Sequence, residues 1–91
     1  MKNILLIIYD PALNSDVLRD RIKSLGPRYT FWNNHWFVES NLNAKDAYER
    51  IITNTSFELS SMIVLDVPKS SFSYYGRMNT TLWEWLKERL K

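Results

Sequence analysis

Residues Asn3 to Tyr9, with the sequence NILLIIY, decide the fold of this chain. From Ile4 to Ile8 every residue is aliphatic, and Asp10 and Pro11 follow the run at once. The run therefore predicts a strand that is buried on both faces and ends in a turn. The segment from Ser61 to Val67, SMIVLDV, has the same character and stops before a proline. We therefore expect two strands that are both covered on their two faces.

Two amphipathic patterns lie between these strands, and each follows a residue that can cap a helix. The first pattern begins at Asn14 or Ser15 and ends near Leu25, before a glycine and a proline that stop helices. The second begins after Asn43 and is the clearest helix in the sequence. Apolar residues recur every three or four positions, as Leu18, Ile22 and Leu25 in the first pattern and as Ala44, Ala47, Tyr48, Ile51 and Ile52 in the second.

A β-hairpin is predicted between the two helices. Two aromatic clusters, at residues 29–32 and 36–39, flank a polar tip that ends in His35, which we expect to be exposed. Alternation along the second strand places Trp36 and Val38 on one face and Phe37 and Glu39 on the other. Aromatic side chains in paired strands usually make core contacts, although Trp32, Trp36, Phe37 and His35 are also the side chains that could stack on bases.

The C-terminal part predicts a loop and a last helix. Lys69 to Asn79 reads as a loop, or as a short strand around residues 71–75. A capping box from Thr81 to Glu84 then starts a helix that ends at Leu90. Its apolar stripe leaves Trp83 to one side, so we expect Trp83 or Trp85 to pack on a partner chain, together with Tyr74 and Tyr75 as interface residues.

The predicted order of elements is strand, helix, strand, strand, helix, strand and a further helix. This order is the α+β, ferredoxin-like βαββαβ pattern with an additional C-terminal helix, in a single domain over residues 1–91. Such a sheet carries both of its helices on one face. The other face of the first and last strands is apolar too. In the first strand, for example, Ile4, Leu6 and Ile8 lie on one face and Leu5 and Ile7 on the other, so both faces must be covered. We expect a homodimer whose sheets face each other; the alternative is a monomer covered by its terminal helix.

Composition excludes several classes of protein. The 91 residues hold no Cys, which excludes disulfide scaffolds and thiolate zinc sites, and His35 is the only His, which argues against a His-rich metal site or a Ser-His triad within one chain. The net charge of +2 is weak for a protein that grips nucleic acid. The longest apolar run is too short to span a bilayer and no signal-peptide cleavage site follows it, so we expect a cytoplasmic protein that does not associate with membranes.

Several short segments are shared, in the same order, with a known group of proteins. These segments are residues 7–10 (IIYD), 23–26 (KSLG), 36–40 (WFVES), 43–46 (NAKD), 63–67 (IVLDV) and 83–87 (WEWLK). Together they resemble the SinR-like group of small CRISPR-associated adaptation proteins, which are related to the virulence-associated D toxins. The resemblance covers nearly the whole chain and implies a ferredoxin-like homodimer from a defence system.

The resemblance also implies a role for Asp10. In nuclease members of the group, the Asp that ends the first strand meets its symmetry mate and can hold a divalent cation. Asp10 is accordingly the candidate catalytic and metal-binding residue for Mg²⁺ or Mn²⁺ in a metal-dependent ribonuclease. The alternative is that its carboxylate accepts backbone hydrogen bonds in the turn before Pro11.

Three functions remain open on the sequence alone, of which one, the binding of small nucleotides in the dimer cleft, has no motif in the sequence. The first is a nucleic-acid-associated role, in which Arg19, Arg21, Lys23 and Arg28 contact the phosphates of RNA or DNA. Acidic residues alternate with these basic ones, as on an ordinary solvated helix face. The second is a non-catalytic protein-interaction module, such as an antitoxin, an inhibitor or a defence or counter-defence factor, whose partner is another protein.

Overall fold

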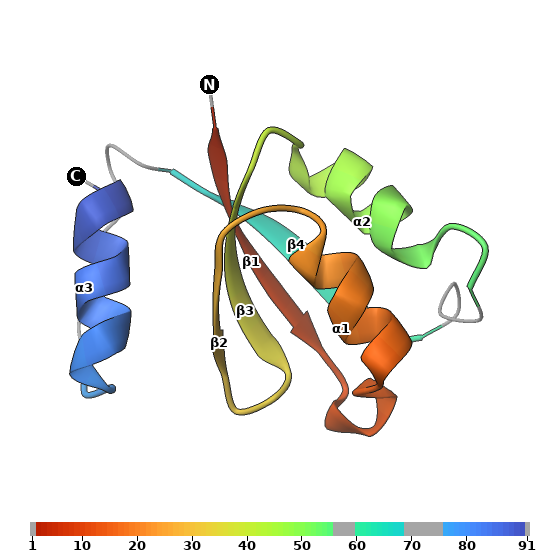
Figure 1. The fold of residues 1–91 in the computed structure, drawn as a ribbon, viewed down its shortest axis with the longest axis horizontal. Coiled ribbons are helices and arrows are strands. Elements are labelled where there is room, and N and C mark those ends of the chain that lie inside the picture. Colours follow the sequence, from red (N-terminus) through yellow and green to blue (C-terminus); the bar gives the residue numbers. More distant parts are fainter. Residues whose placement is uncertain (1, 56–59, 69–75, 91) are drawn as a thin grey trace.

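The computed structural model describes residues 2–55, 60–68 and 76–90, and Figure 1 shows their arrangement. Four described strands form one antiparallel sheet in the order β2-β3-β1-β4. The α+β prediction with a C-terminal helix is confirmed, and the arrangement is compatible with the ferredoxin-like fold. The elements are β1 (Asn3–Tyr9), a 3-10 turn (Pro11–Leu13), α1 (Asp16–Lys23), β2 (Arg28–Phe31), β3 (His35–Ser40), α2 (Ala44–Ile52), β4 (Met62–Val67) and α3 (Thr80–Arg89).

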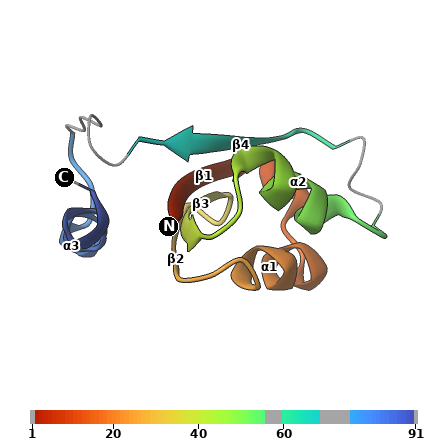
Figure 2. The same cartoon turned by 90° about the horizontal axis from the view of Figure 1, so that it is seen from above.

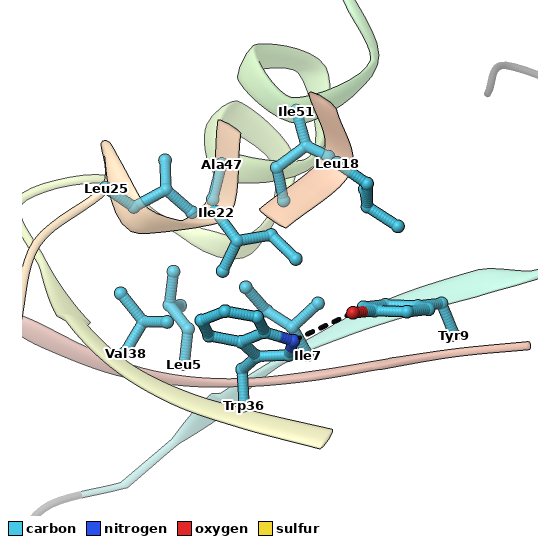
Figure 3. Packing of buried hydrophobic residues seen from close by; sticks show 10 residues of the cluster. All are labelled: Leu5, Ile7, Tyr9, Leu18, Ile22, Leu25, Trp36, Val38, Ala47 and Ile51. Carbon is cyan, nitrogen blue, oxygen red and sulfur yellow. Dashed lines mark hydrogen bonds between the residues drawn. The ribbon is translucent and has the colours of Figure 1, made fainter. Parts of the chain in front are cut away.

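The first core lies between the sheet and helices α1 and α2 (Figure 3). Alternation along β1 turns Leu5 and Ile7 toward this core, and β3 contributes Trp36 and Val38, as the sequence predicts. The apolar side chains of α1 and α2, which recur every three or four residues, pack against this face of the sheet. The buried members are Leu5, Ile7, Tyr9, Leu18, Ile22, Leu25, Trp36, Val38, Ala47 and Ile51.

The second core lies on the opposite face of the sheet, beneath α3. Figure 2 shows α3 lying apart from α1 and α2. The buried leucines of α3 and of its C-cap pack in one cluster with Ile4 and Phe37. The ring of Trp85 lies 6.2 Å from that of Phe37, and Arg89 Nε lies 3.8 Å from Glu39 Oε1. The remaining buried members of this core are Val67, Leu82, Leu86 and Leu90.

Helix α3 covers only part of this second face. A helix is about 10 Å wide and neighbouring strands lie about 4.8 Å apart, so one helix shields about two strands of four. On β4, Ile63 is 50% exposed and Leu65 is 41% exposed. Within the single chain, the last strand is therefore not covered on both of its faces, and its cover by a second copy stays a prediction. The alternative in which the terminal helix covers the whole face is wrong.

The helix ends agree with the sequence in part. Ser15 caps α1 by accepting a hydrogen bond from the N–H of Leu18, and Asn43 caps α2 by accepting one from Asp46. Helix α1 ends at Lys23 rather than near Leu25. The capping box predicted at Thr81 is wrong, because the cap of α3 is Asn79 and the helix begins at Thr80, so both lie two residues earlier than the capping box places them.

Other sequence expectations concern segments that the structure does not describe. The short strand suggested around residues 71–75 lies outside the described residues, as do Tyr74 and Tyr75. Within the described ranges, no helix combines the length and the apolar character that crossing a bilayer requires.

Candidate interaction surface

The uncovered part of the second face forms an apolar surface that we call the open patch. Ile8 on β1 lies directly opposite His35 on β3 and Ile63 on β4, and Leu6 lies directly opposite Leu65. Because opposed residues of paired strands turn their side chains to the same face, these side chains form one continuous strip. The patch consists of Leu6, Ile8, Trp32, His35, Ile63 and Leu65.

Trp32 is the most exposed member of the open patch, with 67% of its surface accessible. It occupies the turn between β2 and β3 with a φ of 54°, followed by Asn33 at 63°. A positive φ is unusual for so large a side chain, and such strain costs about 1–3 kcal/mol. The sequence places Trp32 in the strand, whereas the structure places it in the turn, where its indole contacts the rings of Phe31 and His35.

His35 contacts both aromatic residues at the β2–β3 turn. Its ring lies 5.3 Å from Trp32 and 5.1 Å from Phe31, and its Nδ1 lies 2.9 Å from Asn34 Oδ1. It is half-buried, so the expectation of an exposed histidine is wrong. The suggestion that four aromatic side chains form one stacking surface is wrong as well, because Trp36 and Phe37 are buried in the two separate cores.

A buried polar centre lies at the same end of the sheet, on the other face. Tyr9 Oη accepts a hydrogen bond from Trp36 Nε1 at 3.0 Å and lies 2.9 Å from the carbonyl of Asn33, to which it donates. The guanidinium of Arg19 lies over the Trp36 ring, 5.1 Å from its centroid. Burial raises the pKa of Tyr9, and the hydrogen bond from Trp36 and the charge of Arg19 oppose that rise only in part.

Asp10 is exposed and follows β1 at the start of the 3-10 turn. Its Oδ1 accepts a hydrogen bond from the N–H of Ala12 at 3.0 Å, which is the turn interaction expected for an Asp before a proline. Among the residues that the structure describes, no group of three or more His, Cys, Asp or Glu side chains converges on a metal position. One chain thus supplies a single carboxylate at Asp10, and a Mg²⁺ site there would need ligands from a second copy.

The four basic candidates do not form one surface with the open patch. Arg19 packs on Trp36 in the first core, and Arg21 Nη1 donates to the carbonyl of Arg50 on α2 at 3.2 Å. Lys23 at the end of α1 and Arg28 at the start of β2 are exposed. Since α1 covers the first face, the basic residues of that helix lie across the sheet from the open patch.

Trp83 and Trp85 both pack, partly buried, against the second core. The sequence leaves Trp83 to one side of the helix's apolar stripe, whereas in the structure Trp83 packs against the same core as Trp85. Two further interactions involve α3. The guanidinium of Arg89 lies 4.0 Å from the centroid of the Trp85 ring, and Tyr29 Oη on β2 is hydrogen-bonded to Thr81 Oγ1 on α3. The role of Trp83 in an interface stays a prediction.

The sequence predicts that the second face, which includes Leu6 and Ile8, is apolar and needs cover, but it does not show that Ile63 and Leu65 are the part that stays exposed. Alternation assigns them to the second face, but it carries no information about how far α3 reaches across that face. Comparison with family models, with curated proteins and with solved structures found no match to this chain.

Proposed function

We propose that this chain is a ferredoxin-like, homodimeric protein-interaction module that acts without catalysis, through the open patch. The observation that carries the proposal is the exposure of Trp32, Ile63 and Leu65 on one continuous face. Contiguous apolar surface of this kind marks protein interfaces in soluble domains. Aromatic side chains are enriched at such interfaces, and Trp32 is 67% exposed with a backbone φ of 54°, a conformation that is unusual for a tryptophan.

The charge distribution supports a protein as the partner rather than a nucleic acid. The open patch holds no Lys, Arg, Asp or Glu, whereas nucleic-acid affinity depends on basic side chains placed against phosphates. Two of the four basic candidates, Arg19 and Arg21, are engaged by Trp36 and by the α2 backbone. The remaining two are too few to make a phosphate-binding track.

The state of Asp10 supports a structural role for its carboxylate. It caps the turn at Ala12, and this contact accounts for an Asp at that position without a metal ion. The metal-dependent ribonuclease that the family resemblance implies is therefore the second candidate, and it is the outcome that the experiment must be able to detect.

The test measures the molecular mass of the chain in solution and its ability to cleave RNA. Light scattering of the purified chain should give twice its mass of 10.9 kDa at micromolar concentration. Labelled RNA with Mg²⁺ or Mn²⁺ should remain intact with both the unmodified chain and Asp10→Asn, and no salt-dependent shift of RNA or DNA should appear. A single-chain mass at high concentration contradicts the dimer. Cleavage that Asp10→Asn abolishes contradicts the non-catalytic role.

A further inference from the structure

The outer edge of β4 pairs with no strand among the described residues, and the side chains of β4 are apolar except for Asp66. β4 is the last strand in the sheet order, and no described strand pairs with its outer edge (Figure 2). Edge strands are ordinarily protected by charges, bulges or a covering element, since their free N–H and C=O groups recruit other strands. In β4, Ile63 and Leu65 are both about half exposed and Asp66 is the one charged residue.

The hydrogen-bond pattern identifies which groups point outward. The N–H of Asp10 donates to the carbonyl of Ser61, so that pair is a hydrogen-bonded pair of the antiparallel ladder. Because such pairs alternate, Ile63 and Leu65 direct their backbone groups toward β1. Met62, Val64 and Asp66 then direct their N–H and C=O groups to the outer edge.

We propose that β4 pairs antiparallel with β4 of a second copy about a two-fold axis at Val64, which joins the two sheets into one. This inference rests on the proposed homodimer and replaces packing of sheet on sheet with pairing of edge to edge. In this register Val64 lies opposite its own copy and Met62 lies opposite Asp66 of that copy. The outward-pointing N–H and C=O groups of one β4 then face those of the other β4 along the whole strand, as an antiparallel ladder requires.

The side chains of β4 favour the same register. With Val64 on the axis, Ile63 lies directly opposite Leu65 of the second copy, on the second face, and each covers the other. A shift that brought Asp66 opposite its own copy would place two carboxylates side by side, which is destabilising. The Asp66 carboxylate is also in use within its own chain, since Oδ2 accepts a hydrogen bond from the N–H of Ala44 at 3.3 Å.

A second copy fits this edge because a two-fold axis makes the interface self-complementary. The same patch of each subunit contacts itself, and a strand that lacks charge at its centre meets no like charge there. The two open patches then become neighbours across the axis. Their apolar strips join through Ile63 and Leu65 into a surface that spans both subunits.

Cysteine pairing tests the register, because the chain has no native Cys. Ile63→Cys and Leu65→Cys chains are purified separately, mixed under reducing conditions and then oxidised. Opposed residues in a non-hydrogen-bonded pair have Cα atoms about 4.5 Å apart, within disulfide range, whereas the diagonal distance of about 7–8 Å between identical positions is not. We expect a covalent dimer from the mixture and at least several-fold less from either variant alone.

Matched controls separate this inference from the proposed function. Val17→Cys, at an exposed apolar residue of α1, should give no cross-link in a mixture with Leu65→Cys, and circular dichroism should show that each variant is folded. A dimeric mass with no cross-link in the mixture overturns the edge pairing and leaves the homodimer standing. Equal cross-linking by Ile63→Cys alone overturns the register. A single-chain mass for the unmodified protein overturns both.

Discussion

Trp36 donates its indole N–H to Tyr9 Oη across 3.0 Å, in the layer between the sheet and helices α1 and α2 (Figure 3). Both side chains are buried, so the hydrogen bond gives the indole N–H an acceptor and the Tyr9 hydroxyl a donor where water is not available. Tyr9→Phe should remove the acceptor and leave the indole N–H without it. We expect a loss of about 1–3 kcal/mol in the free energy of unfolding, measured by urea denaturation.

The same tyrosine should make stability depend on alkaline pH. Burial raises the pKa of Tyr9 in the folded state above its ordinary value of about 10, so the folded chain holds this proton more tightly than the unfolded chain. Its contribution is complete below about pH 10 and is lost as the pH rises through the folded-state value. Urea midpoints measured from about pH 8 to 11 should fall more steeply for the unmodified chain than for Tyr9→Phe. Parallel profiles would refute this origin.

Gly26 should not tolerate a side chain. Its φ is +148°, and a Cβ atom there would overlap the backbone carbonyl oxygen of Glu39, which cannot move without disturbing β3. We expect Gly26→Ala to destabilise the chain by about 2–4 kcal/mol. Gly76→Ala is the matched control, because Gly76 has a similar φ of +157° but no described atom within 4 Å of the place that a Cβ would occupy. Equal losses for both variants, measured by thermal unfolding, would attribute the effect to φ alone.

A charge at the centre of the β4 edge should separate the subunits. Ile63→Lys places two ammonium groups near the proposed axis and removes an apolar contact in each copy. Because Ile63 is already half buried in the single chain, that contact is worth about half of the roughly 1.5–3 kcal/mol gained by burying a fully exposed side chain. The dissociation constant of the dimer should therefore rise by more than about tenfold. Val17→Lys makes the same substitution at an apolar residue that is 57% exposed on α1, and it should leave the constant unchanged. Sedimentation or light scattering over a concentration series measures both.

Proline distinguishes the two edges of β4. The N–H of Val64 points outward, so Val64→Pro removes a donor that only the dimer uses, and an edge strand accepts proline in that orientation. The N–H of Leu65 points toward β1, so Leu65→Pro breaks the ladder within the chain. We expect a folded single chain from Val64→Pro and a much larger loss of stability from Leu65→Pro. A Val64→Pro variant that remains dimeric would contradict edge pairing.

Most of the sheet is predictable from the sequence because alternation is a local property. Leu5 and Ile7 face α1 and α2, while Ile4 and Leu6 face the opposite side, as their spacing indicates. The start of α3 is harder to predict because two candidate caps, Asn79 and Thr81, lie two residues apart, and their hydrogen bonds decide between them. The open patch is not predictable, because the exposure of Ile63 depends on where α3 docks, which no local pattern encodes.

At Trp32, the backbone conformation that lowers the stability of the fold also carries the side chain that we propose binds a partner. Gly adopts a φ of 54° without steric cost, and Asn adopts it more readily than Trp does. Trp32→Gly should therefore relieve strain in the turn and also remove the largest side chain of the open patch. Selection for thermal stability alone would replace this tryptophan, whereas selection for partner affinity would retain it. Residue 32 is thus where an engineered, more heat-resistant version of this chain would first lose the contact that we propose for its partner.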